Sequence, residues 1–285
     1  TGTLGANGSL MFDSPASIID TLTINMNGNL LNTQQYYSDV YKAYLDYTIG
    51  TEDYTTRYDL LTAVNTNMQS AANTFTATTI SIPLISSIFG LEFLNLNRLA
   101  QGNIQLNIQF QTDLNKIFIA SANIADLAVT LSNVKLICTY VKLSPDQYSL
   151  LNKIQQASKG PITYYTTNYI TNNMSVIANN TSPLTSNIYF GKSSGKFLQI
   201  ISKLTANNVM TTNSCFRNRN NLSTLQFCIN QINTPQTPLA LSNPSEVISE
   251  LLKTLNVYNN YYHRMLPNRT TFNTNYFLAM VDLES

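Results

Sequence analysis

The alternation of apolar and polar residues predicts strands in the first half of the chain. Residues 21–31 (TLTINMNGNLL) alternate with the period of a half-buried strand. Asn27-Gly28 interrupts this stretch with two residues that tolerate positive φ, so we expect a hairpin turn there. Residues 102–110 (GNIQLNIQF) show the clearest strand pattern, with Ile104, Leu106, Ile108 and Phe110 on one face and Gln and Asn on the other.

Two further stretches favour extended structure. Residues 75–90 are rich in β-branched residues and predict a strand followed by a turn. Residues 127–143 (LAVTLSNVKLICTYVKL) predict one or two strands that are apolar on both faces near Cys138, as in a strand covered on both sides. We therefore expect Cys138 to be a small buried residue.

Helical periodicity appears first in residues 36–49, and Gly50 ends this pattern. A shorter helix is predicted over residues 59–68. The strongest helix start is Ser144-Pro145-Asp146, where Ser is the N-cap, Pro occupies the first helical position and an acid lies in the first turn. Lys159-Gly160-Pro161 ends this helix, which we expect to connect two domains.

Strand signals return after the connector. They are separated by Asn-rich turns and cover residues 163–169, 174–178, 187–190, 197–205, 222–232 and 276–283. Pro244-Ser245-Glu246 begins another helix, with Val247, Ile248, Leu251, Leu252, Leu255 and Tyr258 on one side. Short strands at intervals of 8–12 residues with a few helices predict an all-β architecture of two tandem sandwiches or barrels.

Composition changes this picture by making the surface nearly uncharged. The 285 residues are 44% hydrophobic but only 11% charged, with a formal net charge of +1. Usual proteins carry about 25% charged residues, so Asn, Thr, Ser, Gln and Tyr must cover the surface here. Low net charge favours association, which suggests a component of a large assembly.

The same counts disfavour several classes of function. Duplex binding needs clustered Lys and Arg, which this chain lacks. One His and three scattered Cys, the other two being Cys215 and Cys228, offer no ordinary zinc site and no disulfide signature. No apolar run reaches the roughly 18 residues of a membrane-spanning helix. Residues 1–8 lack the basic segment of a signal peptide, and the chain does not begin with Met.

The residues that would carry catalysis are few. His263 is the only imidazole and lies in NNYYHRMLPN near the expected end of a helix, where capping or an interface explains it better than catalysis. The only close acidic pairs are Glu52-Asp53 and Asp282 with Glu284. A glycosidase needs two carboxylates that face each other across a cleft, and nothing in the sequence indicates this for either pair. We assign no catalytic, cofactor-binding or metal-binding residue.

Four other sequence features have ordinary explanations. Residues 191–196 (GKSSGK) contain a GKS triplet without the Gly five residues earlier that a phosphate-binding loop requires, so we expect a hairpin loop. Arg217-Asn218-Arg219 predicts a solvated or intersubunit loop rather than a nucleic-acid contact. The tyrosine pairs 36–37, 164–165 and 261–262 are expected to fill core and interface sites. Glycosylation sequons begin at Asn7, Asn173, Asn179, Asn180, Asn221 and Asn268, and matter only if the chain is secreted.

The order of these segments resembles a known family. Residues 21–32 (TLTINMNGNLLN) are followed by YYSDVYKAYLDYTIG and YDLLTA, with Lys42-Ala43-Tyr44-Leu45-Asp46 where the family has Arg-Ala-Tyr-x-Glu. The stretch IPLISSIFGLEFLNLNRLAQGNIQLNIQF, the stretch VKLICTYVKLSPDQYSLLNK and the closing YFLAMVDL complete the similarity. The chain thus resembles the double jelly-roll major capsid proteins of tailless icosahedral DNA viruses, in the branch of Polintons, adintoviruses and virophages.

The resemblance implies a division of the chain and a structural role. Residues 1–143 would form the first jelly roll, 144–160 the helical connector and 161–285 the second jelly roll. The family has further strands before TLTINMNG and after YFLAMVDL, so it implies either a shortened member or a chain without its outer strands. Three copies would form a pseudo-hexagonal homotrimer that tiles an icosahedral shell.

The same resemblance sets expectations for partners and location. The partners would be neighbouring capsomers, penton and minor capsid proteins, with a membrane beneath the shell left open and no specific nucleic acid. The chain would be found in the virion and would need no cofactor. Neutral hydrogen-bonded contacts suit such a lattice because they avoid the desolvation cost of buried ion pairs.

Two other functions remain as alternatives. A carbohydrate-binding or adhesin-type β-sandwich also suits an Asn/Thr-rich chain of low charge. The absence of Trp counts against a sugar-stacking platform, although Tyr could serve. A β-sandwich enzyme is disfavoured because no usable His, Cys or carboxylate constellation is visible. Oligomeric state separates the capsid hypothesis from the other two.

Overall fold

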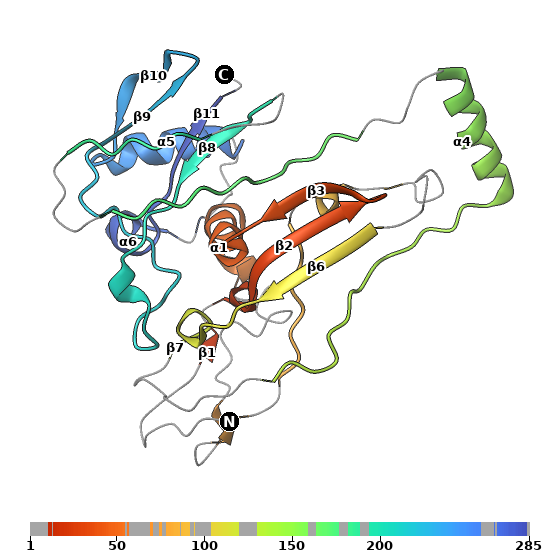
Figure 1. Ribbon diagram of the computed structural model, residues 1–285, viewed down its shortest axis with the longest axis horizontal. Helices are drawn as coiled ribbons and strands as arrows, with labels where there is room; N and C mark the ends of the chain where they lie inside the picture. The colour runs from red at the N-terminus through yellow and green to blue at the C-terminus, as the bar shows by residue number, and fades with distance from the viewer. Residues whose placement is uncertain are drawn as a thin grey trace.

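A computed structural model describes most of the chain and shows a β-rich protein built from small antiparallel sheets and a few helices (Figure 1). The described residues are 11–12, 14–54, 56, 69–70, 74–75, 78–85, 87–91, 94, 104–119, 130–158, 164–176, 182–188, 194–257, 265 and 267–283. The helix expected over residues 59–68 lies outside them.

The first sheet has three strands in the order β3-β2-β6, formed by Ile19–Met26 (β2), Asn29–Gln34 (β3) and Ile104–Phe110 (β6). Asn27 and Gly28 form the two-residue turn between β2 and β3, with φ of 52° and 78°. Two positive φ angles match the right-handed twist of the strands, which confirms the predicted hairpin. The strand predicted over residues 102–110 is likewise present as β6.

One face of this sheet contributes to the first hydrophobic cluster. Its buried members are Ala16, Ile18, Ile19, Leu22, Ile24, Tyr37, Tyr41, Ile117, Phe118 and Met210. The remaining elements on this side of the connector are short: β1 (Met11–Phe12) with β7 (Phe118–Ile119), β4 (Gln69–Ser70) with β5 (Thr74–Phe75), α2 (Thr51–Asp53), and 3-10 turns over Pro15–Ile18, Ser87–Gly90 and Leu114–Lys116. Residues 78–85, for which a strand was expected, carry no assigned strand.

The second group of elements follows the connector. Phe197–Ile200 (β8) pairs with Ala279–Asp282 (β11), and Pro244–Thr254 (α5) packs on β11. Asn243 begins α5 by accepting a hydrogen bond from the backbone N–H of Ser245 at 3.2 Å. The predicted helix and the predicted closing strand are both confirmed.

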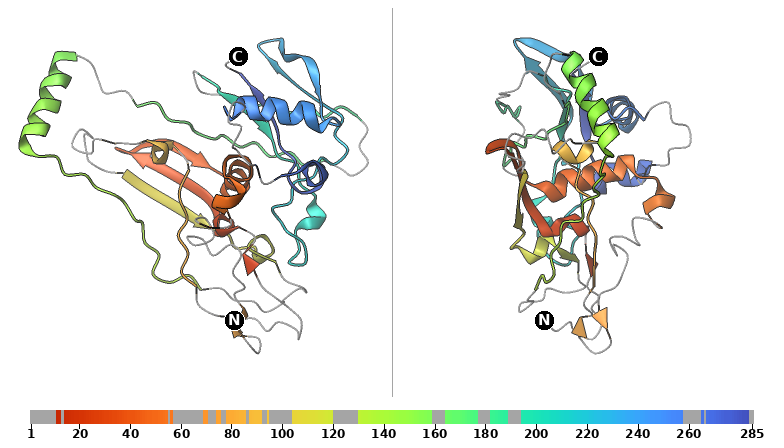
Figure 2. Two further views of the ribbon diagram at one scale, coloured as in Figure 1. Left: turned by 180° about the vertical axis from the view of Figure 1, so that it is seen from behind. Right: turned by 90° about the vertical axis from the view of Figure 1, so that its right-hand side faces the viewer.

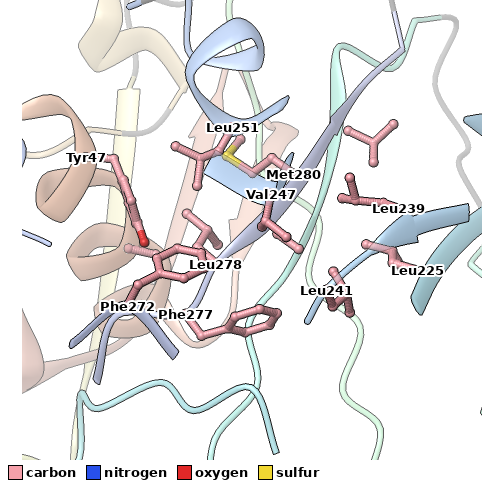
Figure 3. Packing of buried hydrophobic residues seen from close by; sticks show 13 residues of the cluster. Tyr47, Leu225, Leu239, Leu241, Val247, Leu251, Phe272, Phe277, Leu278 and Met280 are labelled. Carbon is pink, nitrogen blue, oxygen red and sulfur yellow. The ribbon is translucent and has the colours of Figure 1, made fainter. Parts of the chain in front are cut away.

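A second hydrophobic cluster lies between these elements (Figure 3). Val247 and Leu251 point from α5 toward Leu278 and Met280, and the rings of Phe272 and Phe277 lie 5.8 Å apart in an edge-on arrangement. The sequence analysis did not predict the helix Arg269–Asn275 (α6), although Asn268 and Thr271 form a full capping box at its start. A 3-10 turn over Thr205–Asn207 completes this group.

Residues 222–232, expected as one strand, are divided between two. Thr224–Ile229 (β9) and Ile232–Ala240 (β10) form a hairpin around Asn230 and Gln231, which both have positive φ. Pro235 and Pro238 lie within β10, where they cannot donate to the ladder. The pairing register shifts between Thr234 and Leu239, so the ladder is interrupted where the prolines lie.

The connecting helix Pro145–Ser158 (α4) is present as predicted, and it stands away from the rest of the molecule in Figure 1 and in the view from behind (Figure 2, left). Extended segments lead to it and back from it. Among the described residues, every paired strand has its partner on the same side of this connector. The described residues thus form a β-rich fold with small antiparallel sheets and few helices.

Candidate functional site: a buried junction and an exposed arm

Helix α1 (Tyr37–Thr48) is packed by both groups of elements. Tyr37 and Tyr41 belong to the first hydrophobic cluster, whereas Ala43 and Tyr47 belong to the second. At 3.6 residues per turn these pairs lie on different faces of one helix. The hydroxyl of Tyr47 donates a hydrogen bond to the carbonyl oxygen of Tyr276, 229 positions along the chain. We call this region the α1 junction.

A buried ion triad lies on a third face of α1. Asp46 is fully buried and pairs with Lys42 one turn earlier on the helix. Its second oxygen accepts a hydrogen bond from Arg217 Nη2 at 2.5 Å, and Arg217 has only 1% of its surface exposed. Arg217 Nε also donates to the carbonyl oxygen of Phe277 at 3.3 Å. The triad therefore joins α1 to the strand region beside β11.

Aromatic rings surround the excess positive charge of this triad. The Lys42 ammonium lies 5.4 Å from the ring centre of Tyr54 and 5.9 Å from that of Tyr276, which permits cation–π attraction. Burial alone lowers the pKa of Lys42, but attraction to Asp46 and Tyr54 raises that pKa above its ordinary value. Burial raises the pKa of Tyr47 despite the opposing effect of Arg217. The lysine thus stays charged and the tyrosine neutral.

Arg217 corrects one prediction from the sequence. We expected Arg217-Asn218-Arg219 to form a solvated or intersubunit loop, but Arg217 is buried by Asp46 and by the backbone of residues 275–277. Arg219 donates to the carbonyl oxygen of Leu222 at 2.6 Å. Lys42 and Asp46 could have been noticed as an i,i+4 pair on a helix, but nothing in the sequence indicated a partner 171 positions away.

The outer face of the first sheet is polar and nearly uncharged. Thr23 of β2 lies opposite Thr33 of β3 and Asn107 of β6, and the two threonine hydroxyls are 3.4 Å apart. Gln105 Nε2 donates to Asn107 Oδ1 at 3.2 Å along β6. This face matches the expectation that Asn, Thr and Gln cover the surface in place of charge.

Exposed apolar side chains are concentrated in the described residues between positions 130 and 188. Most of the exposed large hydrophobic residues of the described chain fall there: Leu131, Val134, Leu136, Ile137, Tyr140, Val141, Leu150, Ile154, Tyr165, Ile170, Met174, Val176, Leu184 and Ile188. Single exposed hydrophobics are ordinary, but a contiguous set is typical of an interaction surface. We call residues 130–143 the arm.

The arm contradicts two expectations. Its residues form no assigned strand, and Cys138 is exposed rather than buried. The physical reason is that no other described segment covers either face of the arm, so the apolar residues beside Cys138 stay in solvent; Ile137 is 84% exposed. Residues 164–169, 174–176 and 187–188, also predicted as strands, likewise carry no assigned strand.

The return segment after α4 is attached to the first sheet by side chains. Asn168 Nδ2 donates to the carbonyl oxygen of Leu31 at 3.1 Å, and the Thr171 hydroxyl donates to that of Gln35 at 3.3 Å. Asn173, in one of the sequons, donates to the Tyr36 hydroxyl at 3.0 Å. A second sequon residue, Asn268, is the N-cap of α6. These asparagines therefore have structural partners.

The other candidates from the sequence do not converge on a site. Glu52 and Asp53 are both exposed at α2, and Asp282 lies at the end of β11. Tyr37 is buried in the first cluster, whereas Tyr165 is 89% exposed. His263, Tyr261, Tyr262, Glu284, residues 191–193 and the sequons at Asn7, Asn179 and Asn180 lie outside the described residues.

Neither a metal centre nor a membrane span is found in the part of the chain that the structure describes. No group of three or more His, Cys, Asp or Glu side chains there is arranged to hold a metal ion. None of the helices described is both long and apolar enough to span a bilayer.

Comparison with known proteins gives no relative from which a role could be transferred: no family model, no curated protein and no solved structure matches the chain.

Proposed function

We propose that this chain is a structural subunit that associates with copies of itself to form a shell, as a double jelly-roll major capsid protein does. The observation that carries the proposal is the apolar surface of residues 130–188, which a single chain leaves in solvent. Large exposed apolar surfaces of this kind are typical of protein–protein contacts. The proposed role is structural rather than catalytic, with the virion as its location.

Two further observations support this function. No described strand pairs with a strand on the other side of α4, which is compatible with two β units joined by a helical connector. A net charge of +1 gives little electrostatic repulsion between copies. In this proposal three copies form a pseudo-hexagonal trimer, and trimers contact one another and penton and minor capsid proteins.

The first test is the mass of the purified chain by light scattering, with electron microscopy of the same sample. We expect a stable trimer of three times 31.8 kDa with a hexagonal outline. A compact monomer at all concentrations, with no ordered particles, would contradict the proposal.

A matched pair of variants ties that result to the proposed surface. Leu136 on the arm and Ile232 at the start of β10 are both exposed aliphatic residues, at 58% and 67%. We expect Leu136→Asp to reduce the trimer fraction several-fold, because it places a charge in an apolar contact. Ile232→Asp should leave the trimer intact. Equal effects of the two substitutions would mean that residues 130–188 are not the contact.

A glycan-binding surface protein is the alternative, and it would need a cleft with stacking rings. A shallow hollow of about 160 Å³ between β3 and the return segment is lined by Leu30, Leu31, Asn32, Thr33, Asn168 and Ile170, with no aromatic ring among them. A second hollow is lined by the rings of Tyr44, Tyr169 and Phe197, but its volume of about 10 Å³ is too small for a sugar ring. A monomer that binds defined oligosaccharides in calorimetry would favour this alternative over the shell protein.

A further inference from the structure

Strand β6 is an open edge of the first sheet. It pairs with β2 on one side, and no described segment pairs with its other side. Leu106 and Ile108 pack against the first hydrophobic cluster, whereas Gln105, Asn107 and Gln109 are exposed. An open edge presents unpaired backbone N–H and C=O groups that can accept another strand.

The arm has a strand pattern but pairs with no described strand, so it complements the open edge of β6. Residues 130–143 run as an extended trace with both faces in solvent (Figure 1). Because side chains of an extended chain alternate, two rows result: Val134, Leu136, Cys138 and Tyr140 on one side, and Lys135, Ile137, Thr139 and Val141 on the other. A segment with such a strand pattern and no ladder has unpaired backbone groups that a sheet edge would satisfy.

Within the described residues, one chain therefore carries both a strand-like segment without a sheet and a sheet edge without a neighbouring strand. Such a pair can be satisfied by exchange between copies, which is a low-cost route to association. The arm leads into α4, which stands off the body in Figures 1 and 2, so the arm belongs to a projecting part of the molecule. Because the net charge is only +1, electrostatic repulsion between two copies is small and hardly opposes this exchange.

We infer that the arm of one copy pairs as a strand with the β6 edge of a second copy of this chain. The exchange extends the β3-β2-β6 sheet by one strand that the neighbour supplies. The row containing Leu136 and Tyr140 then continues the apolar row of Leu106 and Ile108 over the first cluster. This inference rests on the proposed function and names the contact through which the copies associate.

Disulfide trapping tests the exchange directly, because the outer row of the arm would lie beside the exposed residues of β6. The background carries Cys138→Ser and Cys228→Ser, since both thiols are exposed, while Cys215 is buried and retained. One preparation carries Thr139→Cys. A second, differently tagged preparation carries Cys at Gln105, Asn107 or Gln109, which samples the register within the geometric limits of a disulfide.

The two preparations are mixed, assembled and oxidised with diamide. We expect a disulfide-linked heterodimer for at least one β6 position, identified by tag size and by mass spectrometry of the linked peptides. Thr33→Cys on β3 is the matched control, because it is exposed on the same polar face but on the opposite strand. It should give no heterodimer above background.

Two results would overturn the inference. In a chain that carries both substitutions, an internal disulfide with no linkage between chains would show that the arm closes on its own β6. Assembled particles that give no linkage at any β6 position would show a different contact, with the shell function retained. Light scattering of the reduced mixture then shows whether trimers form. Trimers are present in both of these outcomes, whereas no trimer forms at all if the proposed function is wrong.

Discussion

Helices α1 and α4 are of similar length and were both predicted from sequence, yet they end in opposite surroundings. The α1 junction buries side chains on three faces of its helix, including an ion triad. Helix α4 leaves Leu150 and Ile154, its expected apolar stripe, about 60% exposed. The difference shows that local signals decide whether a helix forms here, while residues far along the chain decide whether it is buried.

Strands show the same contrast. Strand β6 and the arm were both predicted as strands, but β6 pairs with β2 and the arm pairs with no described segment. A strand is defined by its partner, whereas a helix satisfies its backbone within itself. Exposure of the arm is thus a property of the isolated chain that an assembly can change, while the α1 junction needs nothing further.

The largest expected effect comes from removing the counterion of the α1 junction. Asp46→Asn leaves the buried cations of Lys42 and Arg217 without a carboxylate. Breaking a buried pair in this way costs about 3–5 kcal/mol. We expect a loss of that order in the free energy of unfolding, measured by urea denaturation with circular dichroism.

Asp39→Asn is the control for this variant, because Asp39 lies on the same helix and pairs with Lys203 at 2.7 Å. That pair is partly exposed, with 23% and 29% of the two side chains accessible. Such pairs contribute about 0–1 kcal/mol. If both variants lost the same free energy of unfolding, the buried triad would stabilise the contact between the two groups of elements no more than a partly exposed ion pair does.

The sequence was sufficient where a signal is local. The Asn27-Gly28 turn and the start of α4 were predicted because a few adjacent residues determine φ or satisfy helix-end donors. It was insufficient where a contact joins distant residues. Arg217 was expected in a solvated loop because nothing near it in sequence reveals Asp46, and Cys138 was expected to be buried because its apolar neighbours do not reveal whether a partner strand is present.

A second effect concerns alkaline pH and depends on the burial of side chains in the α1 junction. Burial raises the pKa of Tyr37 and Tyr47 above their ordinary value of about 10, and the pKa of Lys42 is raised by Asp46 and Tyr54 against the effect of burial. The folded chain then holds protons that the unfolded chain releases above about pH 10. Stability is therefore full below that pH and falls above it, by about 1.4 kcal/mol per pH unit for each such group.

Absorbance titration of the tyrosinate near 295 nm checks this prediction. Tyr37 and Tyr47 should ionise only together with loss of the circular dichroism signal, because burial raises the pKa of both side chains. Tyr169, whose pKa burial raises to about 12, should ionise at a lower pH than Tyr37 and Tyr47. A single tyrosine transition near pH 10 with the fold intact would contradict the burial of the junction.

The smallest effect compares two helix caps of the same kind in the two regions. Ser144 begins α4 with a capping box: its hydroxyl accepts from the Gln147 N–H at 3.3 Å, and Gln147 Oε1 accepts from the Ser144 N–H at 3.1 Å. Asn268 begins α6 with the equivalent arrangement around Thr271. Loss of an N-cap side chain typically costs about 1 kcal/mol.

Helix α6 carries the fully buried Phe272, so Asn268→Ala should lower the global free energy of unfolding by about that amount. Helix α4 is not packed on the body, so Ser144→Ala should leave global unfolding unchanged and instead speed amide hydrogen exchange within residues 145–158. If α4 is covered when copies associate, the same exchange should slow in the assembled protein. A loss of global stability in the monomeric Ser144→Ala variant would show that α4 is already packed in the single chain, and the contrast with α1 would not hold.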